Sequence, residues 1–265
     1  MVDRRRRALR LAVIAAALLV TAGTALGESI GIHAKVTFTK VGYEYRNVEL
    51  SVVRSGRSFS WHLERAYFTR PKLHVRDLDA DGEPEVWVDT YSGGAHCCDE
   101  SRFFHYVPAT KRYATTHHDW GNVSYRLQDV GADGRPELVS SDDRFAYVFT
   151  SFAGSFFPLQ IWRFDHGRVT DVTRSFPART QHDAAKLWKT YLSLRREKIE
   201  PRGVLAAWMA DEYLLGREQG GWARLDAAYR RGELGPRPDL AGWPQGRAYL
   251  RALKAYLRKL GYAGG

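Results

Sequence analysis

Residues 73–98 read "LHVRDLDADGEPEVWVDTYSGGAHCC" and carry the clearest structural signal in the chain. Two short runs rich in apolar and β-branched residues, "LHV" and "EVWV", flank an acidic stretch that contains a glycine. Strand-forming runs separated by Asp and Gly are typical of a hairpin. The loop carries five acidic residues at alternate positions, which are Asp77, Asp79, Asp81, Glu83 and Glu85. The segment therefore predicts two strands joined by an unusually acidic turn.

The same unit recurs 52 residues later in the chain. "HVRDLDADGEPEVWV" at 74–88 aligns with "RLQDVGADGRPELVS" at 126–140, and each copy continues into a second hairpin, at 103–116 and 160–173. Repeats of about four strands are the building unit of β-propellers and related stacked sheets. Closed propellers take four or more such blades. Two recognisable copies therefore predict an incomplete set of blade-like repeats.

Sequence texture divides the chain into a β-rich part and a helical part. Strand patterns begin at 34–41, and 48–64 predicts a hairpin about Ser55-Gly56. After residue 177 the apolar spacing becomes helical, and Thr180 with Asp183 resembles a capping box at the first helix start. We expect an α+β fold: an antiparallel β domain of incomplete propeller-blade-like repeats over 28–177, then a helical domain of about four helices over 178–265.

The first 27 residues have the pattern of a secretory signal peptide. Residues 4–7 and 10 are all arginine, residues 11–22 are apolar, and Ala25 and Gly27 supply the small residues that a signal peptidase reads. A retained membrane anchor is the alternative, but twelve apolar residues are too few to span ~30 Å of hydrocarbon. We therefore expect an exported protein, cleaved between Gly27 and Glu28, with no stable membrane span after cleavage.

Charge is distributed unevenly along the 265 residues. The formal net charge is +10, and it falls to +6 without residues 1–27. Residues 28–180 carry a net charge of −1, whereas residues 181–265 carry 16 basic and 9 acidic side chains, a net charge of +7. A basic region can touch anionic polymers, although such charge is more often a solvated helix face. Nucleic acid is the less expected partner outside the cytosol, so we expect an envelope or extracellular ligand that the sequence does not identify.

Residue spacing in the first acidic loop suits a calcium ion. Calcium takes six to eight oxygen ligands at ~2.4 Å, so carboxylates must converge from alternate residues of a tightly curled backbone. Glycine at the sixth position, Gly82, permits that curl. The seventh residue, Glu83, would contribute its carbonyl oxygen, and Glu85 would close the shell with its side chain. An EF-hand would need a glutamate at position 12, where Val88 stands in a predicted strand.

"DLDADGEPE" resembles the DxDxDGxx[DE] loop of FG-GAP/VCBS-type repeats, which occur in integrin-α-like propellers and many bacterial exported proteins. "DGEPEVWVDTYSGGAHCC" is similar to a set of exported bacterial proteins of unknown function that carry a GGAHCC segment. The resemblance covers residues 71–173. It implies that the loop binds calcium structurally, through the ligands Asp77, Asp79, Asp81, Glu83 and Glu85.

The second copy departs from this loop pattern. It keeps Asp129, Asp133 and Glu137 but has Gly131 at the third position and Arg135 beside the loop. Losing an anion and adding a cation weakens a site whose affinity follows ligand charge. We expect the second loop to be an unmetallated turn or a weak site. For the first loop, a plain metal-free turn is the alternative, although its clustered carboxylates would then repel one another.

The two cysteines, Cys97 and Cys98, are adjacent. A cysteine pair in an oxidising compartment normally bridges, although neighbouring Cα atoms lie only ~3.8 Å apart, below the usual disulfide minimum of about 4.4 Å. A vicinal disulfide is the expected state. The alternative is a transition-metal site or a reactive centre in which His96, Cys97 and Cys98 are joined by His117 or His118, because soft sulfur and imidazole ligands suit copper or zinc.

Common catalytic motifs are absent from the sequence. There is no Gly-x-Ser-x-Gly elbow, no His-Glu-x-x-His and no glycine-rich phosphate loop. The sequence is therefore interpreted as an exported, non-catalytic, calcium-stabilised binding or scaffolding module of the bacterial cell envelope. The alternative is an enzyme or a transition-metal-handling protein centred on His96, Cys97 and Cys98.

Overall fold

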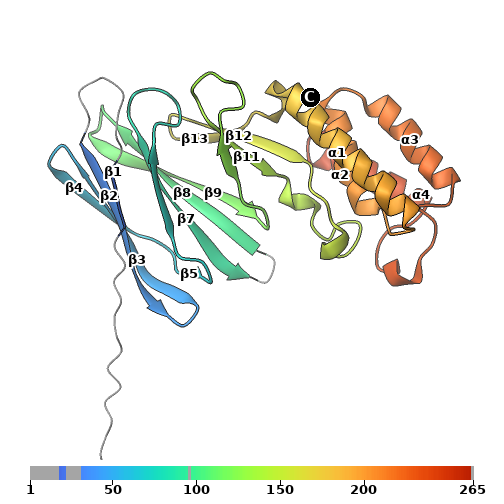
Figure 1. Cartoon of the computed structure of the whole chain (residues 1–265), viewed down its shortest axis with the longest axis horizontal. Helices are drawn as coiled ribbons and strands as arrows, with labels where there is room; N and C mark the ends of the chain where they lie inside the picture. The colour runs from blue at the N-terminus through green and yellow to red at the C-terminus, as the bar shows by residue number, and fades with distance from the viewer. Residues whose placement is uncertain (1–17, 22–30, 95–96, 264–265) are drawn as a thin grey trace, which may run out of the picture. The chain divides into compact units, whose positions relative to one another are not determined.

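The computed structural model describes residues 18–21, 31–94 and 97–263, in which antiparallel sheets precede four α-helices (Figure 1). This confirms the predicted α+β class. The chain forms two compact units: Met1–Asp77 with Asp81–Asp119, and Leu78–Ala80 with Trp120–Gly265. The last strand ends at Asp171 and the first helix begins at Pro177, whereas the predicted boundary lies at 177/178. The compact units divide earlier, because the last sheet groups with the helices.

The first sheet has the strand order β1-β2-β3-β4, and β5 also pairs with β3. Its strands are β1 (Leu18–Thr21), β2 (Ile32–Val41), β3 (Glu44–Arg54), β4 (Arg57–His62) and β5 (Ala66–Tyr67). The predicted turn at Ser55-Gly56 joins β3 to β4, with φ of +47° and +78°. Positive φ at both central residues matches the twist of the flanking strands. β1 lies inside the predicted signal segment, so cleavage before Glu28 would leave β2 as an edge strand.

The second and third sheets are four-stranded meanders of the same design. The second contains β6 (Lys72–Arg76), β7 (Glu85–Gly94), β8 (Cys97–Val107) and β9 (Arg112–Gly121), and the third contains β10 (Arg126–Gln128), β11 (Glu137–Ser141), β12 (Leu159–Asp165) and β13 (Arg168–Asp171). Arg76 pairs with Glu85 in the second sheet, and Gln128 pairs with Glu137 in the third. These pairs are offset by 52 residues, the spacing of the sequence repeat.

Two separate hydrophobic cores correspond to the two units. In the first unit, alternating side chains of β2 and β3 pack with residues of β7 and β8, including Val36, Leu50, Val86 and Phe104. In the second unit, the core is formed by the helices together with Phe145 and Phe149. The period-two alternation in the strands and the three-to-four spacing in the helices therefore each bury one face.

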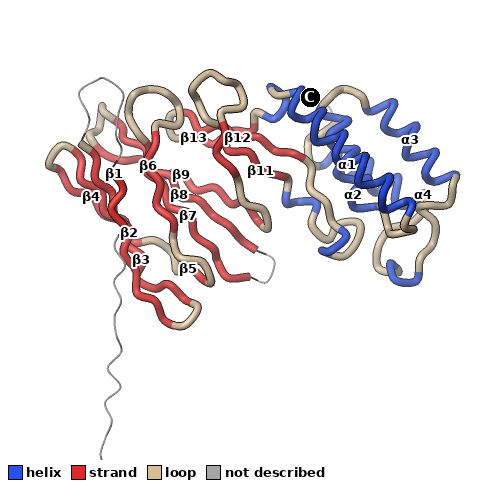
Figure 2. The backbone as a smooth tube through the Cα atoms, viewed as in Figure 1, coloured by secondary structure: helices blue, strands red, loops and turns tan. Residues whose placement is uncertain are grey.

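Four helices follow the strands (Figure 2). They are α1 (Pro177–Arg196), α2 (Arg202–Leu214), α3 (Glu218–Arg230) and α4 (Arg247–Lys259). The predicted capping box was wrong, because α1 begins at Pro177 and Thr180 lies within its first turn, where its hydroxyl donates to the Phe176 carbonyl at 3.3 Å. Proline is favoured at this first position, since its missing N–H needs no partner there.

Gly203 of α2 permits a close backbone approach that no other residue allows. A Cβ at this position would lie 2.0 Å from the carbonyl oxygen of Gly154. We expect Gly203→Ala to destabilise the protein by about 1–3 kcal/mol, the usual cost of overpacking. Gly220→Ala in α3 is the control, because a Cβ there meets nothing within 4 Å and should stabilise by about 0.5–1 kcal/mol. Chemical denaturation of both variants measures the difference, and equal effects would contradict the close approach.

Candidate functional site: two matched acidic loops

The two acidic loops share one backbone conformation. Ala80 and Ala132 have φ of +59° and +53°, and Gly82 and Gly134 have φ of +86° and +82°. The Gly82 N–H donates to Asp77 Oδ2 at 3.0 Å, and the Gly134 N–H donates to Asp129 Oδ2 at 3.0 Å. Since glycine tolerates positive φ without a steric penalty, each repeat closes the same turn around its first aspartate.

Side-chain hydrogen bonding differs between the first aspartates of the two loops. Asp129 uses both oxygens, because Oδ1 also accepts from the Asp133 N–H at 3.1 Å. Asp77 Oδ1 is buried and has no hydrogen-bond partner among the described residues. A buried carboxylate oxygen without a partner is costly. The first aspartate of the first loop therefore has a buried oxygen without a hydrogen-bond partner, whereas both oxygens of Asp129 accept hydrogen bonds.

Asp79, at the centre of the first loop, has a fully buried side chain. Its Oδ2 accepts from the His166 N–H at 2.8 Å, whereas its Oδ1 is buried and has no hydrogen-bond partner within the described part of the chain. The position that matches Asp79 in the second copy is Gly131, which carries no carboxylate. The additional buried charge therefore belongs to the first loop alone.

The other predicted ligands occupy distinct environments. Asp81 accepts from the Glu83 N–H at 2.7 Å, which tightens the turn. The Glu83 carboxylate forms an ion pair with Arg54, whose Nε lies 2.9 Å from Oε1 and whose guanidinium stacks on the Tyr106 ring at 3.8 Å. This ion pair directs the Glu83 side chain to Arg54, so its backbone carbonyl is the group left for a cation.

Glu85 is the first residue of β7 and is completely buried. His105 Nδ1 lies 3.1 Å from Glu85 Oε1. The strand register explains this contact, because Val86 pairs with Phe104 and therefore sets Glu85 opposite His105. His105 thus supplies the first loop with an imidazole beside the buried Glu85 carboxylate.

In the second loop, an arginine stands at the equivalent position. Leu138 pairs with Trp162, so Glu137 lies opposite Arg163. Arg163 donates to Glu137 Oε1 through Nε at 3.1 Å and also through Nη2. The same Nη2 lies 3.6 Å from Asp133 Oδ2. Because a guanidinium stays charged at all ordinary pH values, Arg163 neutralises the second loop permanently.

These contacts define what each loop can do. In the second loop, Arg163 pairs with Glu137. A separate ion pair joins Arg135 of this loop to Asp165 at 2.7 Å. The first loop offers hard oxygen donors on alternate residues, including two buried oxygens without a partner. Oxygen-rich, anionic sites of this kind suit calcium. Among the described residues, the groups of side chains with metal-binding spacing contain Asp79 with Asp81 and His166, and Asp79 with Glu85 and His105. Neither group includes Asp77 or Glu83.

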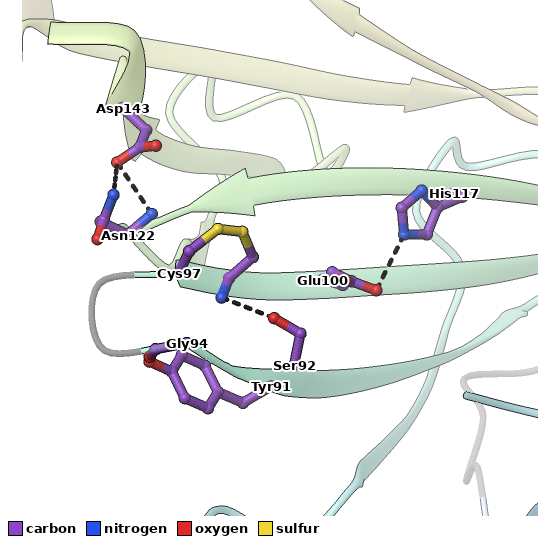
Figure 3. Close-up of a disulfide and its surroundings, with 9 residues drawn as sticks. Tyr91, Ser92, Gly94, Cys97, Glu100, His117, Asn122 and Asp143 are labelled. Atoms are coloured by element: carbon purple, nitrogen blue, oxygen red, sulfur yellow. Dashed lines mark hydrogen bonds and ion pairs between the residues drawn. A yellow bond between two sulfur atoms is a disulfide. The ribbon is translucent and has the colours of Figure 1, made fainter. Parts of the chain in front are cut away.

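The Cys97–Cys98 segment lies at the start of β8 (Figure 3). The two sulfur atoms are bonded to each other, and the Cys98 N–H donates to Ser92 Oγ at 2.9 Å. His117 Nε2 lies 3.2 Å from Glu100 Oε2, and Figure 3 shows the imidazole directed to that carboxylate. His96 lies outside the described residues. Among the described residues, no group with metal-binding spacing includes Cys97, Cys98, His117 or His118.

Thiol titration tests the state of the cysteine pair. We expect the protein, unfolded without reductant, to show no free thiol, and to show two after reduction, because the two sulfur atoms are bonded to each other. The Cys97→Ser plus Cys98→Ser variant is the control and should give no signal in either condition. Two free thiols before reduction would contradict a disulfide.

The sequence did not predict two interacting acidic residues in the helices, of which one is completely buried and the other partly buried. Asp211 of α2 is completely buried, and burial raises its pKa well above the ordinary value, with a further contribution from Asp183 of α1. Burial also raises the pKa of Asp183. The sequence pattern predicted Asp183 to be part of a capping box. Its interaction with Asp211 depends instead on how α1 packs against α2, which local sequence does not indicate.

We expect Asp211→Asn to stabilise the protein at neutral pH. A raised folded-state pKa means that the folded protein holds a proton that the unfolded chain has released, so stability is lost as pH rises from about 4. Asparagine removes this titration while preserving the shape of the side chain. Thermal unfolding at pH 7 should show a higher midpoint for the variant, with the difference shrinking as the pH approaches 3.5. A lower midpoint at pH 7 would show that the ionised carboxylate is favourable.

Comparisons with known proteins place similarity in both parts of the chain. Residues 180–261 match the family model described as the sll0997 C-terminal domain. A probable thylakoid lumen protein, sll0997, of Synechocystis is 31% identical over 203 residues, which cover 72% of this chain and 60% of that protein. An uncharacterized protein, y4bJ, of Sinorhizobium fredii is 31% identical over 166 residues, 59% of this chain and 25% of that protein.

The chain thus spans less than two thirds of either relative. No solved structure matches it. Neither the matching family model nor these relatives carries an FG-GAP or VCBS name, so the comparisons do not support that resemblance. None of the described helices combines the length and apolar content needed to cross a bilayer.

Proposed function

We propose that this protein is an exported, non-catalytic binding or scaffolding module of the bacterial cell envelope, and that calcium stabilises its first acidic loop. The leader pattern of residues 1–27 and the similarity to a probable thylakoid lumen protein support the exported location. Cleavage before Glu28 follows from the same pattern, and N-terminal sequencing of the secreted protein would begin at that residue.

The proposal that calcium binds the first loop is supported by the difference between the two loops. The loops share their turn geometry, but the second is neutralised by Arg163, while Asp77 and Asp79 in the first keep buried oxygens without partners. A buried anion needs a compensating charge. In the first loop, Arg54 pairs with Glu83, and calcium would supply the compensating charge to Asp77 and Asp79.

The proposed ligands are the carboxylates of Asp77, Asp79, Asp81 and Glu85 with the carbonyl oxygen of Glu83. The bound ion would neutralise these oxygens and fix the connection between β6 and β7. Its contribution is to stability, because ligand binding to the folded state alone stabilises by mass action. No reaction is assigned to this site.

Elemental analysis of the protein, purified from the secreted fraction without chelators, tests the proposal. We expect about one calcium per chain and no stoichiometric copper or zinc. The same preparation dialysed against EGTA is the control and should lose the calcium. Stoichiometric copper or zinc that disappears in the Cys97→Ser plus Cys98→Ser variant would instead favour the alternative centred on His96, Cys97 and Cys98.

A further inference from the structure

A basic pocket in the helical part of the chain is separate from both acidic loops. Its volume is about 330 Å³, and it lies at the C-terminal ends of α1 and α3, beside Pro201. Four basic side chains line it, together with one carboxylate, that of Glu233; the basic residues are Arg195, Lys198, Arg231 and Arg237. Small-molecule sites typically begin at about 300 Å³. The pocket therefore combines a suitable size with an excess of positive charge.

The wall of this pocket is held in place from inside. Arg202 is completely buried and donates through Nη2 to the carbonyl oxygens of Leu234 at 3.0 Å and Gly235 at 2.8 Å. The Tyr249 hydroxyl donates to the Arg202 carbonyl at 2.8 Å. These buried hydrogen bonds fix the loop after α3, so its basic residues are positioned before any ligand arrives.

Two of the basic residues already bind a carboxylate. Arg195 Nε lies 2.8 Å from Glu233 Oε1, and Arg231 Nε lies 2.6 Å from the same oxygen. The other carboxylate oxygen, Oε2, accepts from the Tyr191 hydroxyl at 2.5 Å. This cluster shows that the pocket geometry satisfies an oxyanion, and it holds Arg195 and Arg231 in the wall.

The remaining two basic residues, Lys198 and Arg237, do not bind the Glu233 carboxylate. Arg237 pairs with Asp239 through two hydrogen bonds, from Nε and Nη2, at 3.1 Å each. Both side chains are more than a third exposed, and exposed ion pairs are weaker than buried ones. Lys198 has no ion-pair partner among residues 31–94 and 97–263. Lys198 is exposed, and its backbone has a φ of +56° in the turn after α1. Lys198 and Arg237 are therefore the groups that can turn to a new anion.

We propose that this pocket binds a phosphate-type oxyanion, either a soluble phosphate compound or the phosphate of an anionic lipid headgroup. The lining carries three more positive than negative charges, which suits a group with more than one negative charge. Arginine and lysine together provide forked and single donors that match phosphate oxygens. The remaining volume accommodates the part of the ligand that bears the phosphate.

Titration calorimetry with inorganic phosphate and pyrophosphate, and co-sedimentation with vesicles of phosphatidylglycerol or phosphatidylcholine, test this proposal. The test variant is Lys198→Asn plus Arg237→Gln, because asparagine tolerates positive φ and both changes leave the Glu233 cluster intact. The control is Arg251→Gln plus Arg258→Gln, which removes the same charge from exposed positions of α4. All measurements are repeated in EGTA, which separates this pocket from the calcium loop.

We expect at least about a tenfold loss of affinity in the test variant, since two charge-assisted contacts are removed, and little change in the control. If the test variant loses affinity for inorganic phosphate or pyrophosphate, the ligand is a soluble phosphate compound. If it loses affinity only for phosphatidylglycerol vesicles, the ligand is a lipid headgroup. Equal affinity of the wild type and the test variant, an equal loss in the control, or no saturable binding to any probe would overturn the proposal.

Discussion

Replacement of Asp77 by asparagine is expected to abolish the rise in thermal stability that calcium gives the wild-type protein. Calcium at about a hundred times its dissociation constant would stabilise the folded state by ~2.7 kcal/mol, or about 5–10 °C in a protein of this size. Asparagine keeps an acceptor for the Gly82 N–H but removes the negative charge that calcium requires. Scanning calorimetry with calcium and with EGTA measures the effect.

Asp129→Asn is the matched control for this experiment. Asp129 makes the same hydrogen bond to its own loop glycine at the same 3.0 Å. Its Oδ1 also accepts from the Asp133 N–H at 3.1 Å, so the control carries at least the structural cost of the test variant. Only the Asp77 variant should lose its response to calcium. Equal responses in both variants, or a wild-type protein indifferent to EGTA, would count against a calcium ion in the first loop.

Removal of Arg163 has the second large expected effect. Arg163→Leu leaves the completely buried Glu137 carboxylate without its cation, and breaking a buried ion pair in this way costs about 3–5 kcal/mol. The hydrogen bond from the Val130 N–H to Glu137 Oε2, at 2.9 Å, compensates only part of the charge. Chemical denaturation of the variant measures the loss.

Two further variants give this prediction its controls. Arg135→Leu removes a guanidinium whose partner Asp165 is half exposed, so it should cost less than about 1 kcal/mol. Adding Glu137→Gln to Arg163→Leu removes the buried charge and should recover most of the lost stability. A small effect of Arg163→Leu alone would mean that Arg163 does not neutralise the second loop.

Much of the β-rich part could be predicted because its signals are local. The Ser55-Gly56 turn and the 52-residue repeat both depend on residues close together in sequence, and both correspond to paired strands in the structure. Turn residues with positive φ and alternating apolar positions contain that information directly. The four helices followed similarly from apolar spacing.

Long-range pairing explains what could not be predicted. Arg163 pairs with Glu137, 26 residues away in sequence, because of the β11–β12 register. The residues near Glu137 in the sequence do not indicate this contact. Arg135, the basic residue that the sequence does place beside the loop, pairs with Asp165 instead. Likewise, the basic pocket combines the ends of α1 and α3, which only helix packing brings together.

Calorimetric titration of calcium into the EGTA-treated protein tests the central claim most directly. We predict one binding site per chain in the wild type and in Asp129→Asn, and none in Asp77→Asn or Asp79→Asn. Binding that survives in the Asp77 and Asp79 variants, or no binding to the wild type, would contradict the assignment of calcium to the first acidic loop.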